Sequence, residues 1–304
     1  MPTSPDAPSS SSQSSSSPGD PAADTTAPSA DSPEASSPGD DPARGGPRPI
    51  VGIGASSGGV QALRHFFAGL PAEGAATSDD PSSDEGMAFV VVMHLASNAT
   101  SNLPHILQQE TALRVAPAED EAEVRAGTVT VIAPGQHLRI SSGHLVATKG
   151  EDPHDPYTVD RFFRSLAADQ GTNAVGVVLS GSGTDGTLGL RAVKEAGGVV
   201  MVQTPEDAEY PQMPESALAT GVVDRSLPAG QLAETLAEYR SQAGVVQLPG
   251  SEDGLGEQDQ NLLTQIFKEL QRVTGIDFSG YKRSTVLRRL ERRLQLTQTG
   301  TLDR

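Results

Sequence analysis

One serine in this chain lies in a pattern that is typical of activated nucleophiles. Ser56 is the central residue of Gly54-Ala-Ser-Ser-Gly58, which matches the G-x-S-x-G turn between a strand and a helix. Glycines there permit a tight turn, and the start of the following helix offers main-chain N–H groups that can stabilise an oxyanion. Because a chain rich in Gly and Ser also produces this pattern by chance, Ser56 alone predicts little.

Two further polar residues follow apolar runs, and with Ser56 they complete the set that acyl transfer requires. His94 ends the run Phe-Val-Val-Val-Met-His, and Asp185 lies in Ser-Gly-Ser-Gly-Thr-Asp-Gly after another apolar run. Taken singly, a histidine at a strand end is more often structural, and a turn aspartate often caps a helix. In combination, the histidine accepts the serine proton and the aspartate orients and stabilises the imidazolium. We therefore predict a Ser56–His94–Asp185 triad.

The other five histidines have ordinary explanations in the sequence. His65 lies on a predicted helix and His105 near a helix start, whereas the remaining three are expected in surface hairpins or loops: His137, His144 and His154.

The segments around the triad predict alternating strands and helices. Expected strands are 49–54, 88–93, 128–133, 174–179, 199–203 and, more weakly, 222–226, with a hairpin of 137–140 and 144–148. Expected helices are 60–70, 103–110, 159–169, 188–196 and 232–239. The order predicts an α/β fold, a doubly wound, mostly parallel sheet with helices on both faces in three layers. Ligands in such sheets bind outside the carboxyl ends of the strands, where the three residues would meet.

The composition divides the chain into four parts. Residues 1–48 contain too little apolar surface to offset the entropy of ordering, so we expect a disordered low-complexity tail. Residues 49–243 are the predicted catalytic domain, 244–259 a polar linker, and 260–304 a short helical segment.

The composition also excludes several classes of protein. The absence of cysteine excludes disulfides, thiol nucleophiles and thiolate metal sites, and we expect neither a metal nor a cofactor. The formal net charge of −17 argues against binding to nucleic acid or to anionic membranes. The chain has neither a secretory signal nor an apolar run long enough to cross a bilayer, so we expect a cytoplasmic protein without membrane insertion.

Several segments together resemble the chemotaxis receptor-glutamate methylesterases (CheB-type), in the same order along the chain. They are Ile53-Gly-Ala-Ser-Ser-Gly-Gly59, the strand ending in His94, Ile132-Ala-Pro-Gly135, Asn173-Ala-Val-Gly-Val-Val-Leu179 with Gly183-Thr-Asp-Gly186, and Gln212-Met-Pro-Glu215. The resemblance covers essentially all of the chain from Pro49 to Arg240. It implies hydrolysis of glutamate methyl esters on the cytoplasmic domain of methyl-accepting chemoreceptors, with deamidation of particular glutamines as a companion activity.

The resemblance also implies a role for each matching residue. Ser56 would be the nucleophile, with His94 as general base and Asp185 as its orienting carboxylate. Main chain near Ser57 and Ser182 would form the oxyanion pocket, and a loop with Met213 would border the substrate.

Three features depart from the family's usual pattern. The phosphorylatable receiver domain that usually comes first is replaced by the low-complexity tail, so we expect no switching by phosphorylation on this chain. Ser182 stands where the family often has methionine, and Leu95-Ala-Ser replaces the usual Met-Pro after the histidine. These two changes affect the expected substrate specificity and leave the triad intact.

From Leu262 onward the chain resembles the N-terminal helical subdomain of the partner receptor methyltransferase (CheR-type). The segments that carry this resemblance are 274–285 and 287–294, within expected helices at 261–274 and 281–296. An S-adenosylmethionine-binding domain is absent from these 304 residues, so we expect no methyltransferase activity. The Arg-rich second helix either docks on an acidic receptor surface or is a solvated face.

Three other functions remain as alternatives. Gly52-x-Gly54 after a strand is similar to dinucleotide-binding turns, but that fingerprint requires an acidic residue about 20 residues further on, where this chain has none at a strand end. A non-catalytic regulator that binds receptors through an esterase-like shell is the second alternative. A nucleic-acid role for the Arg-rich helix is the third, and it fits poorly with the net charge.

Overall fold

The structure is a computed structural model, and it describes residues 49–71, 86–93, 102–149, 157–242, 257–277, 280–281 and 283–297. The expected tail at 1–48, His94 and most of the expected linker lie outside the described residues.

A parallel sheet forms the centre of the fold. Within the described residues its strands are β1 (Ile50–Ala55), β2 (Ala88–Met93), β3 (Arg114–Pro117), β4 (Thr128–Val131), β7 (Ala174–Val178), β8 (Val199–Gln203) and β9 (Arg225–Leu227). They are ordered β3-β4-β2-β1-β7-β8-β9, and every neighbouring pair is parallel. All residues of β1, β2, β7 and β8 are buried, as the continuous apolar runs predicted.

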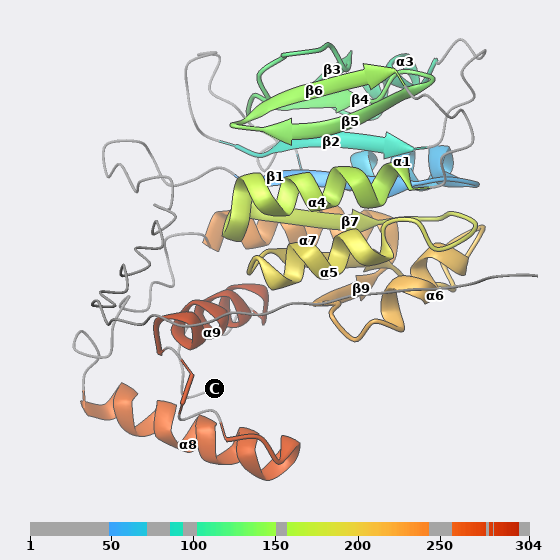
Figure 1. The fold of residues 1–304 in the computed structure, drawn as a ribbon. Helices are drawn as coiled ribbons and strands as arrows, with labels where there is room; N and C mark the ends of the chain where they lie inside the picture. The colour runs from blue at the N-terminus through green and yellow to red at the C-terminus, as the bar shows by residue number, and fades with distance from the viewer. Residues whose placement is uncertain are drawn as a thin grey trace, which may run out of the picture. The chain divides into compact units, whose positions relative to one another are not determined.

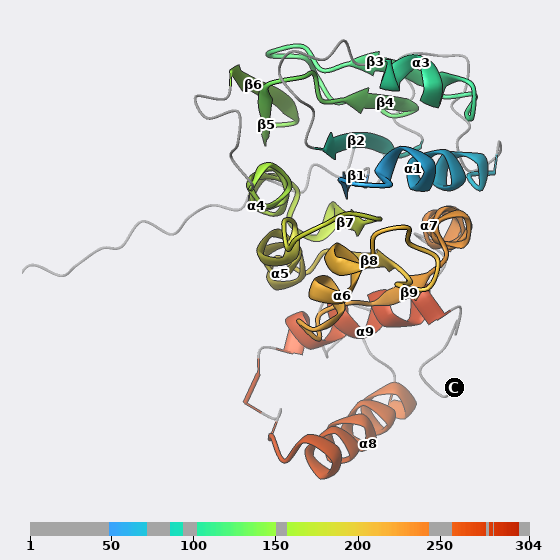
Figure 2. The same ribbon diagram turned by 90° about the vertical axis from the view of Figure 1, so that its right-hand side faces the viewer.

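Helices cover both faces of this sheet, which confirms the predicted three-layer α/β fold. One face carries α4 (Thr158–Gln170), α5 (Thr187–Glu195) and the antiparallel hairpin of β5 (Gln136–Ser141) and β6 (His144–Lys149). The other carries α1 (Gly59–Ala68), α3 (Leu103–Gln108) and α7 (Ala229–Gln242). Figures 1 and 2 show the two helical layers on either side of the strands.

The two glycines of β1 allow α4 to pack closely against the sheet. A Cβ at Gly54 would lie 2.3 Å from Cγ1 of Val159, and a Cβ at Gly52 would lie 2.9 Å from Cε1 of Phe162. Such distances are far inside van der Waals contact, so any larger residue would push the helix away. Helix packing thus accounts for both glycines of the Gly-x-Gly pattern without a bound dinucleotide.

The helices that connect successive strands change from one face of the sheet to the other at its centre. After β1 the chain continues through α1 on one face, whereas after β7 it continues through α5 on the opposite face. β1 and β7 are nevertheless direct neighbours. Parallel sheets bind ligands at such a switch point, in the crevice outside the carboxyl ends of the two strands.

Some elements differ from the sequence predictions. Residues 212–218 form the helix α6 (Gln212–Leu218), so the expected loop around Met213 is wrong. Pro214 is compatible with this helix because it lies in the first turn, where a missing N–H removes no intrahelical bond.

Two strands and one histidine also differ from the predictions. β3 was not expected, since its half-exposed sequence Arg-Val-Ala-Pro has no apolar run. β9 begins three residues later than the expected 222–226 strand. His137, expected at the surface, has a buried side chain on β5, which packs against α4.

Two helices follow the sheet domain, as the sequence predicted. They are α8 (Glu257–Thr274), which begins inside the expected linker, and α9 (Arg283–Thr297). Leu263, Phe267 and Leu287 form an apolar cluster separate from the main core. Arg292 of α9 donates a hydrogen bond to the carbonyl of Gly197, and its guanidinium carbon lies 6.0 Å from the ring centroid of Tyr239 on α7.

Candidate active site

The turns that follow β1 and β7 are bonded to each other at the switch point. The main-chain N–H of Ser56 donates to the carbonyl of Ser180 at 3.0 Å. The hydroxyl of Ser180 donates to the carbonyl of Ser57 at 2.9 Å. The hydroxyls of Ser57 and Ser182 are 3.1 Å apart. The nucleophile candidate and the predicted pocket residues after β7 therefore belong to one hydrogen-bonded unit.

The turn around Ser56 has the tight geometry that its glycines predicted. The N–H of Gly59 donates to the carbonyl of Ser56 at 2.8 Å, which closes the turn directly after the strand. Gly58 has a φ of 71°, a left-handed conformation that side chains rarely adopt. A Cβ at Gly58 would also lie 2.6 Å from the hydroxyl oxygen of Ser180. Glycine is thus required at this position by both conformation and space.

Gly181 brings Met213 and Ser56 close together. A Cβ on Gly181 would lie 2.0 Å from the sulfur of Met213 and 3.0 Å from the Cβ of Ser56. The main-chain N–H of Met213 donates to the carbonyl of Gly181 at 3.0 Å, and the Met213 side chain is 1 % exposed. Met213 thus supports the turn at Gly181 from inside the fold, whereas Ser182, the next residue of that turn, is exposed. The expected contact of Met213 with substrate stays a prediction.

Asp185 is held by main-chain hydrogen bonds at the start of α4. Its Oδ2 accepts the N–H of Val159 at 2.8 Å, and its Oδ1 accepts the N–H groups of Asp160 and Gly186, each at 2.9 Å. The carboxylate is buried, with 6 % exposure. Hydrogen bonds and the positive end of the helix dipole stabilise the ionised form, which an orienting carboxylate requires.

His94 lies outside the described residues, so its role as general base stays a prediction. The strand before it is described: β2 pairs with β1 in parallel, and Ala55 lies opposite Met93. In the sequence, Ser56 directly follows Ala55 and His94 directly follows Met93. The register therefore places the end of β2, which precedes His94 in the sequence, beside the end of β1, which precedes Ser56.

Three polar residues that no sequence motif indicated also support the site. Ser180 joins the two turns, and its main-chain N–H donates to Oε1 of the buried Gln203 at 2.8 Å. Asp160, in the first turn of α4, is also buried. All three act through hydrogen bonds to main chain, which no sequence spacing reveals. For Asp160 the available signal was an acidic residue in the first turn of a predicted helix.

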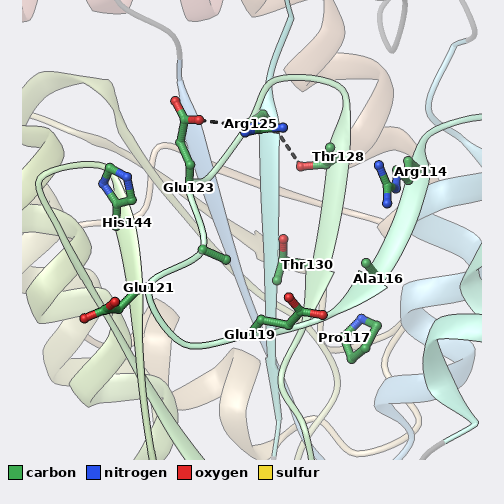
Figure 3. A pocket seen from close by; sticks show the side chains of 11 residues that line it. Arg114, Ala116, Pro117, Glu119, Glu121, Glu123, Arg125, Thr128, Thr130 and His144 are labelled. Carbon is green, nitrogen blue, oxygen red and sulfur yellow. Dashed lines mark hydrogen bonds and ion pairs between the residues drawn. The ribbon is translucent and has the colours of Figure 1, made fainter. Parts of the chain in front are cut away.

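A pocket of about 520 Å³ lies elsewhere, along β3, β4 and the segment between them. Figure 3 shows Arg114, Glu119, Glu121, Glu123 and Arg125 among its lining residues. Glu123 accepts a hydrogen bond from Arg125 at 3.0 Å, and the lining carries both signs of charge. None of the predicted triad or pocket residues lines it, so this pocket is distinct from the candidate active site.

Two further observations concern the described part of the chain alone. It contains no group of three or more His, Cys, Asp or Glu side chains arranged to hold a metal ion. None of its helices combines the length and the apolar character needed to cross a membrane.

Comparison with known proteins identifies the class to which this fold and site belong. The family described as CheB methylesterase matches residues 51–236, and the family described as CheR methyltransferase, all-alpha domain, matches residues 261–304. The chain therefore belongs to the CheB methylesterase family.

Similar individual proteins agree with this class. The crystal structure of the Thermotoga maritima CheB methylesterase catalytic domain is similar with a TM-score of 0.54 and 29 % identity, over 63 % of this chain and 98 % of that one. Protein-glutamate methylesterase/protein-glutamine glutaminase 2 of Anaeromyxobacter dehalogenans is 35 % identical, over 65 % of this chain and 55 % of that protein. An uncharacterized 104.1 kDa protein of Rhodobacter capsulatus is 36 % identical, over 65 % of this chain and 23 % of that protein. The chain thus spans about half or less of these two relatives' lengths.

Proposed function

We propose that this chain is a serine hydrolase that demethylates glutamate methyl esters on the cytoplasmic domain of methyl-accepting chemoreceptors. The observation that carries the proposal is the bonded junction of the Ser56 turn and the β7 turn at the switch point, in a chain of the CheB methylesterase family. The relative from Anaeromyxobacter dehalogenans is named for both a methylesterase and a glutaminase. Deamidation of receptor glutamines at the same site is therefore part of the proposal.

In the proposed mechanism, Ser56 attacks the ester carbonyl while His94 accepts its hydroxyl proton. Main-chain N–H groups near Ser57 and Ser182 stabilise the tetrahedral oxyanion, and the ionised Asp185 stabilises the imidazolium. His94 then protonates the departing methoxide, so that methanol leaves and an acyl-enzyme remains. Water activated by His94 hydrolyses this acyl-enzyme to free glutamate. With a glutamine substrate the same sequence releases ammonia.

The surface around the site favours a protein as substrate. Within the described part of residues 49–242, the exposed large hydrophobic side chains are Val60, Tyr157, Leu188 and Tyr210. Val60, Tyr157 and Leu188 lie at the starts of α1, α4 and α5, and Tyr210 lies two residues before the start of α6. All four positions are therefore at the carboxyl-end edge of the sheet. Exposed apolar side chains that surround a site are typical of protein docking surfaces.

The same proposal assigns the parts of the chain and their location. We assign the catalytic domain to residues 49–243, and residues 260–304 to part of the methyltransferase helical subdomain. The location is the cytoplasm, where the methyl esters of the receptor domain would be. Neither nucleic acid nor direct membrane insertion has a part in this function.

The test is methanol release from a radiomethylated chemoreceptor cytoplasmic fragment. We expect release by the full chain and a loss of roughly 10⁴-fold or more in kcat for Ser56→Ala, because removing a triad nucleophile has costs of that size. Ser57→Ala is the matched control in the same turn: it keeps the main chain of the oxyanion pocket and is expected to retain most activity. Free glutamate methyl ester, lacking the receptor surface, should be a much poorer substrate.

Two results would contradict the proposal. Equal methanol release by Ser56→Ala and the parent would exclude Ser56 as nucleophile. Receptor binding by both proteins without any methanol release would instead support a non-catalytic regulator with an esterase fold.

A further inference from the structure

Two helices at the active-site edge lack a capping side chain at their own N-cap positions. α4 begins after Tyr157 and α5 after Gly186, and neither residue provides a side-chain hydrogen bond to its helix. The first N–H groups of a helix have no partners within it, and burial makes an unpaired N–H costly. Because both helices begin beside the proposed site, the groups that satisfy these N–H donors also affect its geometry.

Each helix start is capped by an aspartate from the other segment. Asp185, in the turn before α5, accepts the N–H groups of Val159 and Asp160 in the first turn of α4. In return, Oδ1 of Asp160 accepts the N–H of Gly189, in the first turn of α5, at 2.7 Å. Asp160 is 3 % exposed, so water competes little for these bonds. The two carboxylates form a reciprocal pair of helix caps.

Gly189 makes this arrangement possible because it allows the two helices to approach closely. A Cβ at Gly189 would lie 2.5 Å from the Cβ of Phe163 and 3.1 Å from the Cα of Asp160. Any other residue would move α5 away from α4, beyond the reach of a short aspartate side chain. The close contact and the cap therefore depend on each other.

We propose that Asp160 is a positioning residue for the esterase reaction, holding the start of α5 against α4 and thereby fixing the carboxylate of Asp185. This inference rests on the proposed function of the Ser56 site. Asp185 precedes α5 by two residues and is bonded to the N–H of Gly186, so a displacement of the helix start displaces Asp185 as well. A shift of about 1 Å in a catalytic group can lower a rate by about 10²-fold.

The test compares Asp160→Ala and Asp160→Asn in the full chain by steady-state methanol release. For Asp160→Ala we expect kcat to fall by about 10- to 100-fold with KM changed by less than about 3-fold, because substrate contacts are retained. Asn keeps an oxygen that can accept the Gly189 N–H, so Asp160→Asn should restore kcat to within about 3-fold of the parent. Should Asp160→Ala not fold, Asp160→Glu replaces it: the longer side chain misplaces the acceptor, and the same loss of kcat is expected.

Asp169→Ala is the matched control for general destabilisation. Asp169 also lies on α4, and its carboxylate accepts main-chain N–H groups of Ser142 and Gly143 in the β5–β6 turn, at the other end of the helix. This variant should lower the melting temperature but leave kcat unchanged. An equal loss of kcat in Asp169→Ala and Asp160→Ala would overturn the inference, as would an unchanged kcat in Asp160→Ala. No release by the parent would instead contradict the proposed function.

Discussion

Asp185 combines two tasks at the scale of the single residue. Its carboxylate accepts three main-chain N–H groups, from Val159, Asp160 and Gly186, and it is the proposed partner of His94. The main-chain hydrogen bonds fix the position of the carboxylate, and the proposed catalytic role requires the carboxylate at that position. Capping a helix and acting as the proposed catalytic aspartate are therefore compatible in one residue.

Asp185→Asn separates charge from shape at this position. The amide cannot stabilise an imidazolium, and its NH₂ group would face a main-chain N–H donor. We expect kcat for methanol release to fall by roughly 10⁴-fold, as for the orienting aspartate of serine-protease triads, and the free energy of unfolding to fall by about 1–2 kcal/mol. Methanol release and urea denaturation measure the two effects.

Asp120→Asn is the control for that substitution. Asp120 also accepts a main-chain N–H, that of Ala147, at 2.8 Å, and it belongs to the segment between β3 and β4, away from the site. Its replacement should leave kcat unchanged. A parent-like kcat in Asp185→Asn would remove Asp185 from the proposed triad.

At the scale of the element, the contact between β1 and α4 decides the position of the site. The Cβ that Gly54 lacks would lie 2.3 Å from Val159, the residue whose N–H binds Asp185. Gly54→Ala should therefore push the first turn of α4 outward, lower the free energy of unfolding by about 1–3 kcal/mol through overpacking, and reduce kcat. Denaturation and methanol release measure both.

Two further variants make the Gly54 experiment decisive. Adding Val159→Ala removes the clashing methyl groups and should recover part of both losses. Gly230→Ala on α7 is the control: the nearest atom to its Cβ is 3.4 Å away, and alanine is the better helix former, so stability should stay equal or rise by up to about 1 kcal/mol. A Gly54→Ala protein as stable and active as the parent would show that close packing of α4 is dispensable.

At the scale of the whole molecule, Tyr239 gives the fold a dependence on alkaline pH. Burial raises the pKa of Tyr239 above its usual 10.0, although Arg292 of α9, which lies beside the ring, acts in the opposite direction. A raised pKa in the folded state means that the folded protein retains the phenol proton while the unfolded chain loses it. Stability is therefore fully present below pH 10 and is lost as the pH rises toward the folded-state value.

Tyr239→Phe tests this dependence, because phenylalanine has no proton to lose. We expect the free energy of unfolding of the parent to fall more steeply than that of Tyr239→Phe between about pH 9 and pH 11, as measured by urea denaturation. Tyr210→Phe, which removes an exposed phenol, should follow the parent. Parallel curves for the parent and Tyr239→Phe would contradict a raised pKa.

Sequence alone determined the class of fold and most of its elements. The continuous apolar runs 88–93 and 199–203 form strands over the same residues. A strand that is buried on both faces is apolar at nearly every position, so its bounds can be read directly from the sequence. The segments around Ser56 and Asp185 also indicated the family from the sequence alone. Edge strand β3 and helix α6 were missed, since a half-exposed strand and a short helix containing proline have no such pattern.

Tertiary structure decided the features that depend on distance between segments far apart in the sequence. Gly52 and Gly54 are required by a helix that follows about a hundred residues later, and Met213 lies on a helix, where it packs against the turn at Gly181. The reciprocal caps of Asp160 and Asp185 are a relation between two helix starts, and no local pattern encodes it. The sequence specifies which groups can form hydrogen bonds, but packing of the helices on the sheet selects the partners, because these bonds are short and directional.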